Sequence, residues 1–210
     1  MENALALFII ISLFALWKLD FIATLLNLKA LDPKLPNEFT DVFDSEKYAQ
    51  SQNYTRATEK FGILESIFSL MLMLGFWLSG GFGWLDNLVR GFGYGEIITG
   101  LVFMGILFVS QMIIMIPFQL YDTFVIEEKF GFNKTTLKTF IIDQIKGLIL
   151  LALIGGPILA LILWIFDAVP MAWLWAWAAF TVIQLLLTYI APSVFPVSYT
   201  HLTLATIYSV

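Results

Sequence analysis

Cysteine is absent from this 210-residue chain, and histidine occurs only once, at His201. Without cysteine the chain can form no disulfide bond. Structural and catalytic zinc sites use several cysteine, histidine or carboxylate ligands, so this chain alone offers almost no means of building one. Basic residues are also in the minority, and the formal net charge is −5. The sequence therefore contains no basic patch for nucleic acid, which we do not expect as a partner.

Motifs of hydrolytic and phosphate-binding enzymes are missing as well. The chain contains no H-E-x-x-H, no G-x-S-x-G and no phosphate-cradling G-x-x-x-x-G-K-[ST]. Glu127 and Glu128 are adjacent acids, but neighbours on a helix point about 100° apart. A solvated charge cluster with Lys129 is therefore favoured over an acid–base pair. Local chemistry predicts no catalytic residue and no metal ligand.

Charge of either sign is scarce, at 13% of residues, whereas 60% of residues are hydrophobic and the mean hydropathy is +0.87. A soluble domain of this size cannot bury so much apolar surface, so the sequence predicts an all-α integral membrane protein in a lipid bilayer. Five apolar runs predict transmembrane helices at about 4–28, 61–79, 97–118, 147–166 and 171–192. The first run is interpreted as an anchor, because no positive charge precedes it and no signal-peptide cleavage site follows it.

Capping and breaker residues predict the ends of these helices. The second helix can begin at about Ser45, capped by Asp44 or Ser45, and continue without a breaker into its span. Residues 80–96 are rich in glycine and are expected to form an irregular loop. Gly155-Gly156-Pro157 is expected to interrupt the fourth span, and residues 167–170 are expected to form a tight hairpin.

Positive charge is distributed unevenly among the loops. Nine of the eleven lysines and arginines lie in loops 27–60 and 119–147, whereas Arg90 is alone in the loops of the opposite side. The positive-inside rule therefore places these two loops in the cytoplasm and the N-terminus outside. The N-x-T sequons at Asn53 and Asn133 would then face the cytoplasm and would not be glycosylated.

The segment 121–147, YDTFVIEEKFGFNKTTLKTFIIDQIKG, is the long charged stretch between two strongly apolar ones. Gly131-Phe132-Asn133 predicts a turn, with Asn133 as the N-cap of the following helix. Apolar residues then recur at helical spacing, with lysines between them. This pattern predicts an amphipathic segment that lies at the cytoplasmic membrane surface before the chain enters the bilayer.

Two glutamines, Gln111 and Gln184, lie inside predicted spans. Polar side chains at such positions either hydrogen-bond between helices or line a polar cavity. The sequence leaves both interpretations open.

This charged segment resembles a stretch typical of the CAAX prenyl protease 1 family of integral-membrane zinc metalloendopeptidases. Residues 39–61, FTDVFDSEKYAQSQNYTRATEKF, resemble the family's first cytoplasmic loop, and Ile190-Ala-Pro192 resembles the exit of its fifth span. The resemblance covers about residues 4–196. The residues that carry the signature of the charged segment are Tyr121, Phe124, Glu127, Glu128, Gly131, Phe132 and Asn133.

The resemblance implies that this chain is part of an incomplete helical barrel around an intramembrane chamber, which Gln111 and Gln184 could line. It also implies that the intact protein carries Zn²⁺ and cleaves protein or peptide substrates near prenylated C-termini. In the family, the H-E-x-x-H motif lies beyond the fifth span, so this 210-residue chain would itself be non-catalytic. The membrane would be a bacterial inner membrane or the endoplasmic reticulum.

Residues 197–210, VSYTHLTLATIYSV, depart abruptly from the family and resemble the translation of a sequencing adapter. We therefore expect a native membrane region over residues 1–196 and a non-native tail over 197–210, which includes His201. The alternative is a genuine short C-terminus. The protein would then be a stand-alone five-span membrane protein that binds or scaffolds partners without catalysis.

Overall fold

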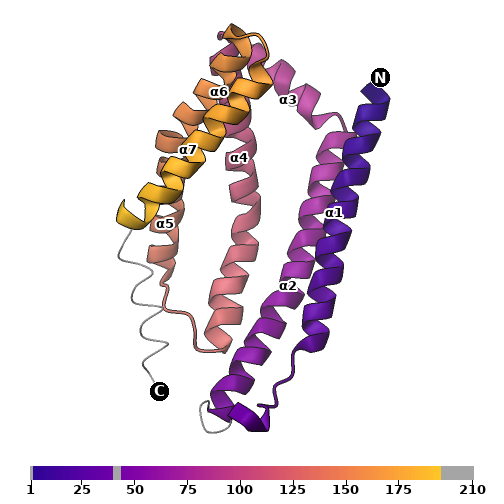
Figure 1. Cartoon of the computed structure of the whole chain (residues 1–210), viewed down its shortest axis with the longest axis vertical. Coiled ribbons are helices and arrows are strands. Elements are labelled where there is room, and N and C mark those ends of the chain that lie inside the picture. The colour runs from indigo at the N-terminus through magenta and orange to yellow at the C-terminus, as the bar shows by residue number, and fades with distance from the viewer. Residues whose placement is uncertain (1, 40–43, 195–210) are drawn as a thin grey trace. The chain divides into compact units, whose positions relative to one another are not determined.

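The computed structural model describes residues 2–39 and 44–194, and all regular structure within these ranges is helical (Figure 1). Five helical runs are long and apolar enough to cross a membrane. These runs are Ala4–Ala30, Ser45–Leu78, Glu96–Glu127, Leu137–Ala168 and Ala172–Ile190. The predicted all-α class and the five spans are therefore confirmed.

The chain divides into two compact units. The first unit contains α1 (Glu2–Ala30), α2 (Ser45–Leu78) and the chain from Ile114 to Thr135. Among the described residues, the second unit contains 85–113 and 136–194. Helix α4 (Glu96–Tyr121) contributes its first part to the second unit and its last part to the first. Within the first unit, α1 and α2 lie side by side (Figure 1).

Helix α2 begins where the sequence predicts. The Asp44 side chain accepts hydrogen bonds from the backbone N–H groups of Glu46 at 2.8 Å and Lys47 at 3.3 Å. These bonds satisfy two of the N–H groups that a helix start leaves unpaired. The helix then continues for 34 residues, or roughly 51 Å at 1.5 Å per residue, which exceeds the ~30 Å hydrocarbon core. Its polar N-terminal part therefore extends out of the membrane.

Residues 80–96 were expected to be irregular, and this prediction is wrong for most of the segment. Helix α3 occupies Gly81–Arg90, and the irregular chain is confined to the residues that follow it. Leu85 and Val89, one turn apart, are buried, with 2% and 0% of their surfaces exposed. Asp86 and Arg90 form an ion pair on a more exposed face. This amphipathic spacing outweighs the helix-weakening effect of the glycines.

The fourth span consists of α5 (Leu137–Leu150), the π-helical turn η3 (Leu151–Gly155) and α6 (Gly156–Ala168). Pro157 lacks an N–H group and cannot donate a hydrogen bond to the residue four positions earlier, which gives a physical reason for the wider turn before it. The predicted interruption takes the form of this π-helical turn, and the helical run continues through it without a break.

The amphipathic segment predicted before this span is helical, and its place at a membrane surface stays a prediction. Its residues belong to one continuous helical run of 32 residues. At 1.5 Å per residue this run is roughly 48 Å long, so about a third of it exceeds the hydrocarbon core. The lysine-bearing end can therefore reach the headgroups without a separate helix.

The predicted hairpin between the last two spans is present. Helix α6 ends at Ala168 and α7 (Ala172–Val194) follows after three residues, with Met171 in the left-handed region at φ +57°. Helices α6 and α7 pack against each other within the second unit.

Candidate functional site

The signature residues lie where α4 ends and the chain turns. Tyr121 is the last residue of α4, and Phe124 and Glu127 belong to the π-helical turn η2 (Asp122–Glu127) that follows. Ile126 in this turn is buried, with 6% of its surface exposed. A π-helical turn inserts an extra residue into a helix and often marks a functional position.

Gly131 closes the helix end. The backbone N–H of Phe132 donates to the Glu127 carbonyl at 2.9 Å, and that of Gly131 donates to the Glu128 carbonyl at 3.0 Å. This pair of bonds is the Schellman arrangement, which requires a left-handed residue just beyond the helix. Gly131 has φ +73°, a conformation that glycine adopts without steric cost.

Asn133 was expected to cap the next helix, but it does not. Its Oδ1 accepts a hydrogen bond from the Thr135 backbone N–H at 2.6 Å, and its Nδ2 donates to Glu128 Oε2 at 3.0 Å. The N-cap of α5 is Thr136, whose Oγ1 accepts from the Thr139 backbone N–H at 3.2 Å. Asparagine suits both a helix cap and an Asx turn, so local sequence could not separate the two roles.

The polar part of α2 holds this turn through four residues, Gln50, Tyr54, Phe130 and Phe132, which we call the clasp. Gln50 Nε2 donates to the Phe130 carbonyl at 2.5 Å. One helical turn later, the Tyr54 ring lies 4.7 Å from the Phe132 ring and 5.7 Å from the Phe130 ring, edge to face in both pairs. Such geometry is the favoured arrangement of aromatic pairs. The clasp therefore joins the first and third loops within the first unit.

A second aromatic contact lies further along α2. The Phe61 ring is 4.8 Å from the Tyr121 ring and 6.0 Å from that of Phe118. Tyr54 and Phe61 are both part of the family resemblance in the sequence, whereas Gln50 was missed. The signal that could have identified Gln50 is its position one helical turn before Tyr54 on the same face.

The clasp has the chemistry of a binding or positioning element. It pairs aromatic rings and amides and contains no nucleophile with an adjacent base. Among residues 2–39 and 44–194, no group of three or more His, Cys, Asp or Glu side chains is placed to hold a metal ion. The zinc ion that the resemblance implies therefore does not fit the described residues, and His201 lies outside them.

Gln111 and Gln184 are exposed on α4 and α7. Neither side chain lines the cavities described below. Their orientation toward a chamber stays a prediction.

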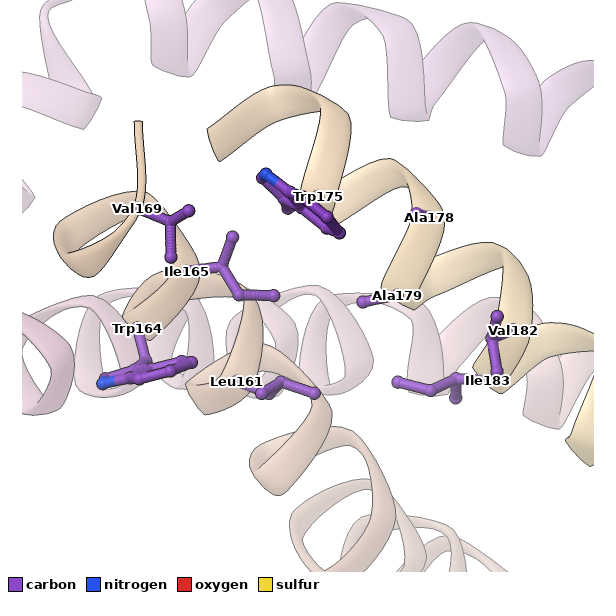
Figure 2. Close-up of a pocket in the computed structure, with 9 residues that line it drawn as sticks. All are labelled: Leu161, Trp164, Ile165, Val169, Trp175, Ala178, Ala179, Val182 and Ile183. Carbon is purple, nitrogen blue, oxygen red and sulfur yellow. The ribbon is translucent and has the colours of Figure 1, made fainter. Parts of the chain in front are cut away.

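A cleft of about 540 Å³ lies between α6 and α7. Figure 2 shows the side chains of Ile165 from α6 and of Trp175 and Val182 from α7 around it. All of the lining residues are apolar. The cleft can therefore hold apolar groups but cannot supply acid–base chemistry.

Two other cavities are bordered by charged side chains. One of about 480 Å³ in the second unit is bordered by Arg90, which pairs with Asp86 at 2.9 Å and Glu96 at 3.1 Å. Hydrogen bonds from Arg90 to these carboxylates, Asp86 first, raise the pKa of the guanidinium further above its high ordinary value. The other, about 370 Å³, lies between α1 and α2 and is bordered by Asp20 and Glu59.

Comparison with known proteins identifies this architecture. A family model described as the CAAX prenyl protease N-terminal region, with five membrane helices, matches residues 24–196. The chain belongs to the CAAX prenyl protease family. The matched range includes the four clasp residues and all seven signature residues.

Individual relatives agree with this assignment. CAAX prenyl protease 1 of Saccharomyces cerevisiae is 37% identical over 175 residues, which cover 78% of this chain and 39% of the yeast protein. The CAAX prenyl protease 1 homolog of Homo sapiens is 32% identical and matches 75% of this chain and 36% of its own length. The crystal structure of S. mikatae Ste24p matches with a TM-score of 0.76 and 34% identity, over 88% of this chain and 45% of that one.

The chain spans about two fifths of the length of the curated relatives described here. It corresponds to the N-terminal membrane portion of this protease family.

Proposed function

We propose that this chain is the N-terminal membrane portion of a zinc metalloendopeptidase that cleaves prenylated protein C-termini, and that it is non-catalytic by itself. The match of residues 24–196 to the family's five-helix region supports the proposal most directly. Among the described residues no group of three or more His, Cys, Asp or Glu side chains could hold a metal ion, so the proposal assigns the zinc ligands to a later part of the protein. No catalytic step is assigned to the residues described here.

The contribution of this portion is positioning. The clasp fixes the turn after α4 against α2, so the two spans meet at a defined register where they leave the membrane. An enclosed active site needs surrounding helices that hold their positions. Small displacements of the groups that position a substrate can lower the catalytic rate by a large factor. In the intact protein, Gln111 and Gln184 would add polar groups to the chamber wall.

The first experiment is to read the gene beyond the codon for Pro196 with primers that cannot amplify an adapter. The proposal requires a continuation that encodes H-E-x-x-H and a downstream glutamate. The complete protein should then cleave a farnesylated C-a-a-X peptide in detergent, and a chelator should abolish the cleavage. A stop codon after Val210 in clean template would contradict the proposal and favour the stand-alone binding or scaffold protein.

The proposed membrane is the endoplasmic reticulum, because the named relatives are eukaryotic. The proposed topology has loops 27–60 and 119–147 in the cytosol and the N-terminus outside. Because the chain has no cysteine, a single introduced cysteine reports its side without background. In sealed, cytosol-side-out vesicles, an impermeant maleimide should modify Ser51→Cys and should leave Asn87→Cys unmodified until detergent is added. The reverse pattern would invert the proposed topology.

A further inference from the structure

The fourth span contains a joint at η3. The backbone N–H of Gly156 donates to the carbonyl of Leu151, five residues earlier instead of four. Pro157 follows and has no N–H group to donate, so the hydrogen-bond ladder loses one bond at this point. Sharp bends in helices occur at proline, at pairs of small residues and at π-helical turns. The joint combines all three, because Gly155 and Gly156 directly precede the proline.

The two helices that meet at this joint are held very differently. Helix α6 packs against α7 and contains the buried side chain of Ile165. Leu163 of α6 also lies beside Gly100 of α4, where an added Cβ would be 2.8 Å from its Cδ1. Among the described elements, by contrast, α5 has extensive backbone contact only with η3, to which it is joined, and it contains no buried residue. Helix α6 is therefore fixed, and α5 is the helix that is free to move.

Open space lies beside the joint, within the second unit. An apolar groove of about 500 Å³ has α4 from Leu101 to Val109 as one wall. The other wall runs from the end of α5 through η3 into α6. A Cβ atom built on Gly105 or on Gly156 would meet nothing within 4 Å. We call this space the α4–α6 groove, and it gives α5 room to move toward α4.

We propose that η3 is a hinge about which α5 swings toward α4 and closes the α4–α6 groove, while α6 stays fixed. Helix α5 has 14 residues and is roughly 21 Å long. A rotation of about 20°, the size of a helix kink, moves its far end by ~7 Å. Contact with lipid and contact between apolar helices differ little in free energy within a bilayer, so both positions of α5 are populated.

Pairs of spin labels measure this movement in the 210-residue chain in lipid nanodiscs. The chain has no cysteine, so labels attach only at introduced sites. Ile113→Cys on α4 with Ile141→Cys on α5 is the moving pair, and Ile113→Cys with Phe166→Cys on α6 is the fixed pair. All three of these side chains are exposed, and none of them lines the groove.

Electron paramagnetic resonance of frozen samples records the distance distribution of each pair. The moving pair should give two distances that differ by several ångströms, and the fixed pair should give one. A single distance for the moving pair would overturn the proposal. Equal broadening of both pairs would also overturn it, because α6 would then move as much as α5.

Two substitutions test the joint and the groove separately. Pro157→Ala restores the missing N–H group and favours a continuous helix, so the moving pair should give a single distance. Gly105→Leu fills the groove and should remove the shorter distance while leaving the longer one. Gly75→Leu on α2 makes the same change where nothing lies within 4 Å and should leave both distances. Persistence of both distances in Gly105→Leu would overturn the proposal even if Pro157→Ala failed to fold.

The distance measurement requires no catalysis, so it separates this inference from the proposed function. If the complete protein cleaves farnesylated peptides but its moving pair gives a single distance, the hinge is wrong and the protease proposal stands. If clean template ends at Val210 and the chain gives two distances, the protease proposal fails and the hinge stands.

Discussion

The two units of this chain are held together in opposite ways. In the first unit, long side chains bridge distant segments, as when Gln50 and Tyr54 of α2 reach Phe130 and Phe132. In the second unit, the close approach of α4 and α6 depends on a missing side chain at Gly100, with Leu163 filling the space. One unit is therefore sensitive to the removal of side chains and the other to their addition.

The environment of each contact explains this difference. The clasp lies where α2 extends beyond the hydrocarbon core and meets water. Burial of aromatic rings away from water is favourable there, so contacts between rings stabilise the clasp. The contact between α4 and α6 lies within spans, where lipid is as apolar as the side chains and helices associate through close packing of small residues. Similar apolar composition thus produces two kinds of contact. Four substitutions test this difference between the two units.

The largest effect is expected for Tyr54→Ala, which removes both ring pairs of the clasp. Loss of two aromatic pairs and of the buried ring area should lower the unfolding free energy by about 3 kcal/mol. Thermal unfolding in mild detergent, followed by circular dichroism, measures the change. Tyr54→Phe keeps both rings and should behave like the parent chain. If Tyr54→Ala and Tyr54→Phe are equally destabilised, the aromatic ring pairs do not account for the stability of the clasp.

Next in size is Gly100→Leu, which adds a side chain where Leu163 already lies 2.8 Å from the nearest added atom. Overpacking of this kind should cost about 2 kcal/mol. Gly105→Leu is the matched control on the same helix, because its Cβ meets nothing within 4 Å. The same unfolding assay should separate the two variants by several degrees in Tm. Equal Tm values would show that α4 and α6 do not pack closely at Gly100.

A smaller effect is expected for Asn133→Ala. This change removes the bond to the Thr135 N–H and the bond to Glu128, and it should cost about 1 kcal/mol. Glu128→Ala removes only the second bond, which is exposed, and should cost less. Hydrogen exchange of the turn should increase more in the first variant than in the second. The opposite order would assign the role of Asn133 to its contact with Glu128.

The smallest effect is expected for Arg90→Met. Its pairs with Asp86 and Glu96 are exposed, and solvent-exposed ion pairs contribute little to stability. The unfolding midpoint should stay unchanged, and added salt should affect parent and variant alike. A marked loss of stability in Arg90→Met would show that α3 depends on this ion pair and not on burial of Leu85 and Val89.

Several features could be predicted from the sequence because they depend on neighbouring residues. The Asp44 cap is a local pairing of a side chain with the N–H groups two and three residues later. The π-helical turn before Pro157 follows from one missing N–H group. Helix α3 was missed because its amphipathic signal is only ten residues long and begins among glycines. The choice of Thr136 over Asn133 as the cap was missed because both residues suit that role.

The membrane class, the five spans and the resemblance to the CAAX proteases could be predicted from the sequence, because hydropathy and sequence motifs are properties of contiguous residues. Contacts between distant residues could not be predicted in this way. Gln50 reaches Phe130 across 80 positions, and residues of α6 border the space beside Gly105. Such contacts depend on the packing of helices, and in an apolar environment many packings satisfy the same hydropathy pattern. Only the folded chain selects one of them.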